Sequence, residues 1–240
     1  MRHSSDAASS GVLERAFSLV DALAKNAPAT LTTLSRLTKL PTSSALRLLK
    51  SLEGLGMVAR DPNGSYRLGR RFVEVGLLAL DEVVPIELTR PYLRALASGT
   101  GESANCAIQV EGAVVYVDQV PSERAIRHMS WIGRRVPLHG TAIGSALRLE
   151  LNDDGFSYTR DTVEPDVTAI AAPVIGGIGV VICAISVTGP SYRISDVRIR
   201  EIGALVANTA SALGETLSAI NSPERFESLV TAARSIQHST

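Results

Sequence analysis

A run of hydroxyl and cationic side chains between residues 42 and 50 has the composition of a surface that reads nucleic acid. Thr42, Ser43 and Ser44 stand together, Arg47 follows one helical turn later, and Lys50 lies beyond it. Hydroxyls hydrogen-bond bases or phosphates, and an arginine can hold a guanine through two hydrogen bonds. The alternative interpretation is that Thr42 or Ser43 only caps a helix and Arg47 is a solvated surface residue.

Other basic and polar residues flank this run on both sides. Arg36 and Lys39 precede it and suit phosphate contacts. Arg60, Asn63 and Arg67 follow it, around a sharp turn, where they could lie along the DNA backbone or in a minor groove. We therefore expect one basic surface built from several short elements.

Three amphipathic helices and a hairpin are expected to position these side chains. Apolar spacing predicts helices over 11–25, 31–38 and 42–55. Strands are predicted over 57–61 and 65–68, because the Pro-Asn-Gly sequence between them favours a tight turn. This order is that of a winged helix-turn-helix, in which the second helix of the pair enters the major groove of DNA.

The net charge of zero conceals an asymmetry between the two parts of the chain. Residues 1–80 contain 11 basic and 6 acidic side chains, a net charge of +5. Residues 81–240 contain 13 basic and 18 acidic side chains, a net charge of −5. Such a division is expected when one domain contacts phosphate and the other does not.

The rest of the chain predicts a second domain of mixed helices and strands. A helix over 70–84 carries more apolar residues than a solvated linker needs, so we expect it to pack against a partner chain; another helix follows over 85–98. Strands are predicted over 106–110, 114–120, 125–131, 168–175 and 178–187. A small-residue helix after residue 137 and a long helix from a cap at Ser195 to residue 220 complete an α+β domain with an antiparallel sheet.

Export, membrane insertion and disulfide chemistry are not expected. Residues 1–10 are polar and do not resemble a signal peptide, and the longest apolar stretch, 178–187, is too short to span a bilayer. Cys106 and Cys183 lie in apolar, strand-like runs and are interpreted as reduced core thiols. The expectation is a cytoplasmic protein with no membrane partner.

Two other functional classes remain as alternatives. A thiol dyad of Cys106 with His128 or His139, near Asp118, would make the second domain an enzyme, although no motif fixes this geometry. A winged helix used only for protein contacts would not show DNA binding that weakens steeply with salt. The histidines and cysteines have no metal-ligand spacing, so we expect no metal, cofactor or catalytic residue.

Motifs along nearly the whole chain resemble the IclR family of bacterial regulators. In the first half they are VLERA at 12–16, LPTSSALRLL at 40–49 and YRLG at 66–69. In the second half they are TGES at 100–103, PLHGTAIGSA at 137–146, AAPV at 171–174 and ISVTGP at 185–190. The resemblance implies a winged helix-turn-helix DNA-binding domain (10–69), a linker and dimerisation helix (70–84), a GAF-like effector-binding domain (85–222) and tails at 1–9 and 223–240.

The resemblance also implies that a small organic acid binds between the sheet and the segment after residue 137. Four residues match effector-contacting positions of the family, and four more surround a helix N-terminus that could meet a carboxylate. These residues are Thr159, Ala169, Ser186 and Thr188, with Gly140, Thr141, Ala142 and Ile143. His128 and Trp131 could line the pocket wall, the alternative being that Trp131 is plain core and His128 faces solvent.

Several positions depart from the family pattern. Lys39 replaces a usual glycine, and Thr42 replaces a frequent lysine, which makes the start of the recognition helix less basic. Ala169 replaces a common cysteine and Thr159 a common acidic residue, which predicts a less polar pocket suited to an aromatic or larger apolar acid. Residues 149–155 replace a longer helical segment, so we expect the effector domain to be trimmed at one edge of its pocket.

Together these features predict a ligand-responsive repressor of a catabolic operon. It would bind a palindromic double-stranded DNA operator as a homodimer or a dimer of dimers. A small organic acid would release or remodel the complex by favouring one conformation of the second domain.

Overall fold

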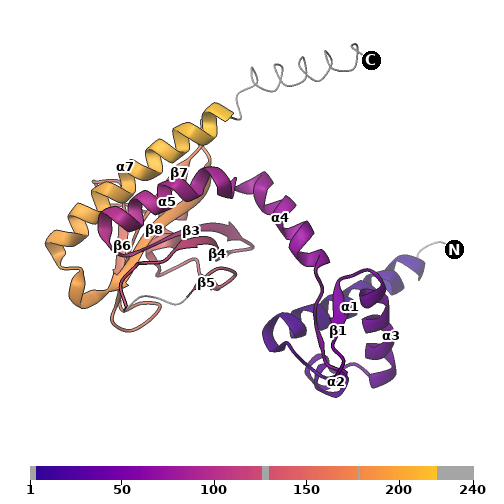
Figure 1. The fold of residues 1–240 in the computed structure, drawn as a ribbon. Helices are drawn as coiled ribbons and strands as arrows, with labels where there is room; N and C mark the ends of the chain where they lie inside the picture. Colours follow the sequence, from indigo (N-terminus) through magenta and orange to yellow (C-terminus); the bar gives the residue numbers. More distant parts are fainter. Residues whose placement is uncertain (1–3, 126–129, 178, 221–240) are drawn as a thin grey trace, which may run out of the picture. The chain divides into compact units, whose positions relative to one another are not determined.

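The computed structural model describes residues 4–125, 130–177 and 179–220, which form two compact units, 1–79 and 80–240. The boundary falls inside helix α4 (Arg71–Val83), within the segment 70–84 that the sequence predicts as a connecting helix. Figure 1 shows the elements of each unit. No described helix is long and apolar enough to cross a membrane.

The first unit is a helical domain with a two-stranded wing. It contains α1 (Ser4–Asn26), α2 (Leu31–Thr38), α3 (Thr42–Gly54), β1 (Val58–Arg60) and β2 (Tyr66–Leu68). Its core consists of side chains that recur at helical spacing on the three helices, joined by Tyr66 from the wing. The predicted winged helix-turn-helix fold is confirmed, and helix 31–38 has the predicted bounds.

One glycine allows the wing to pack closely on the chain that precedes it. A Cβ atom on Gly69 would lie 2.0 Å from the carbonyl oxygen of Gly56, a distance that no side chain permits. The N–H of Gly69 donates to the carbonyl of Met57 at 2.8 Å, and Ala29 pairs with Tyr66 through two backbone hydrogen bonds. The wing is therefore fixed to the helices through the backbone as well as through its apolar side chains.

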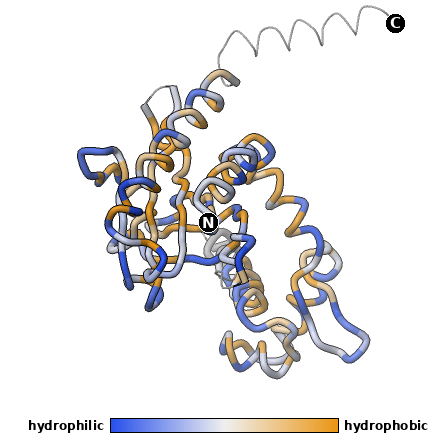
Figure 2. Tube along the Cα trace, turned by 60° about the vertical axis from the view of Figure 1, so that its left-hand side comes forward, coloured by the Kyte–Doolittle hydropathy of each residue, from blue (hydrophilic) through white to orange (hydrophobic). Residues whose placement is uncertain are grey.

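The second unit is built on a six-stranded antiparallel sheet of order β5-β4-β3-β8-β7-β6. The strands are β3 (Ser103–Val110), β4 (Ala113–Val120), β5 (Arg135–Pro137), β6 (Ser157–Arg160), β7 (Val167–Ile175) and β8 (Val181–Pro190). In Figure 2 the strands are mainly hydrophobic and many of the loops that join them are hydrophilic. The expected antiparallel sheet with packed helices is confirmed.

Helices cover both faces of this sheet. The long helices α5 (Ile86–Thr100) and α7 (Asp196–Ile220) lie side by side on one face (Figure 1) and enclose the larger core. The short helix α6 (Ala142–Leu147) packs on the other face with a smaller apolar cluster. A single 3-10 turn, Ser191–Arg193, precedes α7, and Ser195 caps that helix by accepting from the N–H of Arg198 at 3.3 Å, as predicted.

The structure differs from the sequence expectations at several elements. Helix α1 begins at Ser4, although residues 1–9 were expected to form a tail. Neither Thr42 nor Ser43 caps α3, because Pro41 occupies the N-cap position and no side chain caps the helix there. Residues 126–129 of the strand expected over 125–131 lie outside the described residues, and its described ends, including Trp131, are not strand. The edge strands β5 and β6 were not predicted, because runs of three and four residues acquire their conformation by pairing with β4 and β7.

Candidate functional sites

A hydrogen-bonded turn fixes α3 relative to α2. The hydroxyl of Ser35 donates to the carbonyl of Leu40 at 2.5 Å and lies 3.3 Å from the Thr42 hydroxyl, so it bridges the end of α2 and the start of α3. Lys39 ends α2 in the left-handed conformation, with a φ of 58°. This role of Ser35 could not be predicted from sequence, because nothing in the local pattern distinguishes it from other serines.

The helix α3 has one buried and one exposed face. Ala45, Leu48 and Leu49 are buried in the core of the first unit. The residues predicted to contact DNA lie mostly on the other face: Thr42, Ser43, Arg47 and Lys50 are exposed, and Ser44 is half-buried. The helix therefore presents hydroxyls at its start and two cations further along, on a surface that the core leaves open to a partner.

Most of the cationic side chains near this face have no ion-pair partner in the described part of the chain. Within the described part of the chain, Arg36, Lys39, Arg47 and Lys50 form no ion pair, and all four are exposed. Exposed positive charges on neighbouring elements attract counter-ions or a polyanion. This surface is thus suited to a partner that carries many negative charges.

The wing residues are more constrained than predicted. Arg67 forms an ion pair with Asp61 at 3.0 Å, and the guanidinium of Arg60 lies over the Tyr66 ring, 5.5 Å from its centroid. Asn63 uses its side-chain oxygen to accept from the N–H of Ser65 at 3.0 Å. Asn63 therefore shapes the turn, while Gly64 supplies the positive φ of 86° that the turn requires.

Seven of the ten residues predicted to bind an effector surround one small cavity in the second unit. They are Trp131, Thr141, Ala142, Ile143, Thr159, Ala169 and Thr188. Gly140 and Ser186 do not line the cavity, and His128 lies outside the described residues. The cavity has a volume of about 20 Å³, so its side chains almost fill it in this conformation.

Thr141 serves a structural purpose at this cavity. Its hydroxyl donates to the carbonyl of Pro137 at 3.0 Å and accepts from the N–H of Gly144 at 3.1 Å, which caps α6. The hydroxyl is buried, and both of its hydrogen-bonding roles are already used. The structure therefore gives less support to the expected contact between a carboxylate and this helix terminus. Helix α6 has only six residues, and the Thr141 side chain already pairs with one of its N–H groups.

A polar cluster lies in the sheet beneath the cavity. Asn105 on β3 donates from its side-chain nitrogen to the hydroxyls of Thr188 at 3.1 Å and Ser186 at 3.5 Å, both on β8. All three side chains are buried. The expectation that Ser186 and Thr188 share one face of their strand is confirmed, but Asn105 was missed because β3 and β8 are distant in sequence.

Aromatic and charged side chains form the outer wall of the cavity. Trp131 packs edge-to-face on Tyr116, with ring centroids 4.9 Å apart, and burial raises the pKa of the Tyr116 phenol well above its ordinary value. The guanidinium of Arg134 lies 4.4 Å from the centroid of the Trp131 ring and pairs with Glu164 at 2.5 Å. We call the Arg134–Glu164 pair the clasp; it joins the loop after Trp131 to the loop before β7.

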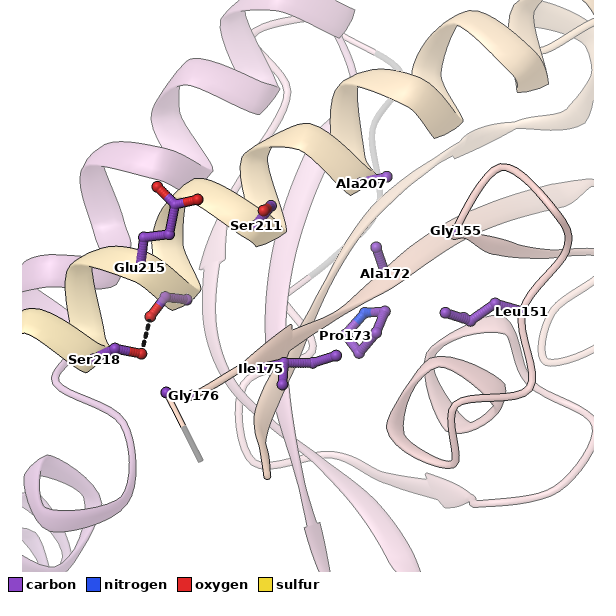
Figure 3. Close-up of a pocket in the computed structure, with 12 residues that line it drawn as sticks. Leu151, Gly155, Ala172, Pro173, Ile175, Gly176, Ala207, Ser211, Glu215 and Ser218 are labelled. Carbon is purple, nitrogen blue, oxygen red and sulfur yellow. Dashed lines mark hydrogen bonds between the residues drawn. The ribbon is translucent and has the colours of Figure 1, made fainter. Parts of the chain in front are cut away.

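The shortened segment 149–155 does not border this cavity, which corrects the expectation of a trimmed pocket edge. It makes a tight turn in which the Asn152 side chain accepts from the N–H groups of Asp154 and Phe156. The turn borders a separate open groove of about 630 Å³ (Figure 3). Residues of the end of β7 and of α7, among them Pro173 and Glu215, complete the lining of that groove.

In the described part of the chain, the two thiols are buried away from solvent, which does not favour a thiol dyad. Cys106 and Cys183 are fully buried in the core beneath α5 and α7, and a hydrogen bond to Cys183, followed by burial, raises the pKa of Cys106. Asp118 is held by Arg90, whose Nε donates to it at 3.1 Å. His139 is exposed, and His128 lies outside the described residues. A protonated, inaccessible thiol is a poor nucleophile.

A winged helix with an open cationic reading face, linked to an α/β unit with an internal cavity, defines the class of ligand-responsive DNA-binding proteins. Two family descriptions match the chain and make the assignment specific. The IclR helix-turn-helix domain matches residues 12–62, and the C-terminal domain of the bacterial transcriptional regulator IclR matches 78–152 and 148–215. The chain belongs to the IclR family of transcriptional regulators. The two C-terminal matches meet where the segment 149–155 is shortened.

Curated relatives resemble the chain along most of its length. The transcriptional regulator KdgR of Escherichia coli K12 is 26% identical over 232 residues, covering 82% of this chain and 88% of KdgR. The transcriptional repressor AllR of the same strain is 24% identical over 242 residues, covering 85% of this chain and 89% of AllR. Both similarities extend across the DNA-binding and C-terminal units.

Solved structures share the fold at lower sequence identity. The IclR protein of Thermotoga maritima has a TM-score of 0.69 and 19% identity, covering 87% of this chain and 99% of that one. An IclR homologue of Microbacterium hydrocarbonoxydans, solved in complex with 4-hydroxybenzoate, has a TM-score of 0.68 and 19% identity, covering 84% and 99%. These similarities establish the fold of both units.

Proposed function

We propose that the protein is a repressor that binds a palindromic operator through α3 and is released or remodelled by a small organic acid bound in the second unit. The observation that carries this proposal is the exposed face of α3, where the Thr42 and Ser43 side chains are exposed and Arg47 and Lys50 form no ion pair in the described part of the chain. Arg47 would read a base edge, and Arg36 and Lys39 would contact phosphates. Repression is supported by the resemblance to AllR, itself described as a repressor.

An organic acid is the proposed effector because of the residues around the cavity. Thr188 offers a hydroxyl, while Tyr116, Trp131 and Ile143 provide apolar and aromatic surface. The Microbacterium homologue that binds 4-hydroxybenzoate gives independent support for an aromatic acid. Ligand pockets are usually about 300–1,000 Å³, so the cavity must expand before an acid enters.

Expansion of the cavity couples ligand binding to conformation. An acid that binds only the expanded form shifts the population towards that form, and the energy of coupling is the difference between its affinities for the two forms. We propose that this change alters the spacing of the two DNA-reading units of a dimer. No catalytic step is part of the proposal, and binding to the chromosome would locate the protein in the cytoplasm.

A homodimer, or a dimer of dimers, is proposed because α4 has an apolar surface that the described chain leaves exposed. No described residue of α4 is buried, and Val73, Leu77 and Leu78 are each more than 60% exposed. Apolar residues predominate along this helix (Figure 2). Packing α4 of one chain against a second copy would remove this surface from water and pair two recognition helices.

The DNA-binding proposal is tested by selecting duplexes from a random pool with the purified full chain and measuring affinity by fluorescence anisotropy. The selected sequences should contain two related half-sites about one helical turn apart. Affinity should fall steeply as salt is raised from about 50 to 200 mM, because bound phosphates release counter-ions. Failure to enrich any sequence, or affinity that does not depend on salt, would contradict the proposal.

A further inference from the structure

The side-chain oxygen of Asn105 is a buried hydrogen-bond acceptor without a donor. Asn105 is 1% exposed, and its Oδ1 has no hydrogen-bond partner among the described residues. Buried acceptors are almost always paired, because a buried acceptor loses its hydrogen bonds to water and is destabilising unless another donor replaces them. An unpaired atom of this kind points to a donor that arrives from outside the chain.

The strand register places Asn105 on the sheet face that bears the cavity. Asn105 is opposite Ser186, and Thr188 on the same strand as Ser186 is opposite Ala169. Directly opposite residues of antiparallel strands point to one face, and so do alternate residues of one strand. Thr188 and Ala169 both line the cavity. Asn105 therefore does not line the cavity itself, but it is hydrogen-bonded to Thr188, which does.

The amide nitrogen of Asn105 sets the direction of the neighbouring hydrogen bonds. An amide NH2 group can only donate, so the Thr188 hydroxyl at 3.1 Å and the Ser186 hydroxyl at 3.5 Å accept from it. Each of these hydroxyls keeps its own hydrogen available as a donor. Hydroxyl donors are the complement of a carboxylate, whereas the Thr141 hydroxyl already donates to Pro137.

We propose that Asn105 determines the specificity of the cavity and that the effector is a hydroxy acid. In the expanded cavity the carboxylate accepts from Thr188, which lines it, and Asn105 Oδ1, directly behind Thr188, accepts from a hydroxyl on the same ligand. This inference rests on the proposed effector site in the second unit and specifies its ligand class.

The first test compares acids that differ by one hydroxyl, with the full-length protein and isothermal titration calorimetry. The pairs are glycolate and acetate, lactate and propionate, and 4-hydroxybenzoate and benzoate; they cover different distances between the hydroxyl and the carboxylate. In at least one pair the hydroxylated acid should bind roughly tenfold more tightly, because it alone pairs the buried acceptor. Equal affinities within every pair that binds would overturn the inference and leave the acid-binding site intact.

The second test removes or changes the amide. Asn105→Leu keeps a similar shape without polar atoms, so the preference for the hydroxylated acid should fall to about one while the protein stays folded. Asn105→Asp presents acceptors only; both hydroxyls would then donate to it, and all the acids should bind at least about tenfold more weakly. Asn208→Asp, the same change at an exposed position of α7, is the matched control and should bind as the wild type does.

The outcomes separate this inference from the function on which it rests. Retention of the wild-type hydroxyl preference in Asn105→Leu would overturn the role of Asn105, even though the effector site would stand. Absence of binding by every acid would overturn both the hydroxy-acid inference and the proposed organic-acid effector. If Asn105→Leu fails to fold, the wild-type comparison of paired acids still decides whether a hydroxyl is recognised.

Discussion

The exposed face of α3 and the cavity of the second unit differ in whether they can bind a partner without rearrangement. On α3 the polar groups are exposed, and Arg47 and Lys50 have no ion-pair partner in the described part of the chain. At the cavity Thr141 and Thr188 are buried and hydrogen-bonded within the chain, and about 20 Å³ of space remains. The first surface can meet a partner as it stands, whereas the second must rearrange.

This difference is what a ligand-responsive regulator requires. A preformed reading face binds DNA without first paying an energetic cost for rearrangement, so its affinity depends mainly on charge and side-chain identity. A closed cavity makes ligand binding conditional on a change of conformation, so that occupancy can be transmitted.

The largest effect is expected from Leu49→Ala in the core of the first unit. Leu49 is completely buried, so its truncation should destabilise that unit by about 2–5 kcal/mol. Differential scanning calorimetry should show a lower melting temperature for the first unit and an unchanged transition for the second. A single transition that shifts as a whole would mean that the two units unfold together.

Thr188→Val, a change at the cavity, should affect acid binding and leave DNA binding intact. Valine has nearly the same shape but cannot donate to a carboxylate, and it leaves the Asn105 nitrogen with only the Ser186 hydroxyl at 3.5 Å. The affinity for acids should fall by about tenfold, and DNA binding without ligand should not change. Ser186→Ala should act in the same direction. Normal acid binding in both variants would locate the ligand elsewhere.

Lys39→Gly should have opposite effects on stability and DNA affinity. Lysine at a φ of 58° is strained, so glycine should stabilise the first unit by up to about 1 kcal/mol. Loss of one phosphate contact should reduce the slope of log affinity against log salt by about one. Lys39→Asn, which also tolerates this backbone conformation, is the control for charge loss; an unchanged slope in both variants would remove Lys39 from the DNA contact.

Glu164→Gln should have the smallest effect on stability and still change ligand access. The clasp is partly exposed, so its loss should cost less than about 1 kcal/mol. If the clasp keeps the cavity closed, stopped-flow quenching of Trp131 fluorescence should show faster association of an acid. Glu123→Gln, at an exposed position outside the clasp, is the control. Equal association rates in all three proteins would show that the cavity opens by another route.

The helices and long strands could be predicted from sequence because local pattern determines them. Helix 31–38 has the predicted bounds, and Leu34 is buried as its helical spacing requires. The turn around Gly64 was predicted for the same reason: only a small residue readily adopts its positive φ. These features depend on residues within one or two turns of each other.

Features that depend on distant parts of the chain could not be predicted in this way. The short strand β6 exists because it pairs with β7, and Asn105 meets Thr188 across 83 positions of sequence. The family resemblance placed Thr159, Ala169 and Thr188 together, but it did not reveal Arg134 and Glu164 at the same wall. The location of the segment 149–155 beside a different groove could be seen only from the fold.

Recognition of DNA by α3 is the property from which the regulatory function follows. Anisotropy titrations of the selected operator should compare the wild type, Arg47→Ala and Arg94→Ala, the last being an exposed arginine of the second unit. Arg47→Ala should weaken binding by roughly 10- to 100-fold with an unchanged melting temperature, and Arg94→Ala should bind normally. Wild-type affinity in Arg47→Ala, or an equal loss in both variants, would contradict the assignment of α3 as the recognition helix.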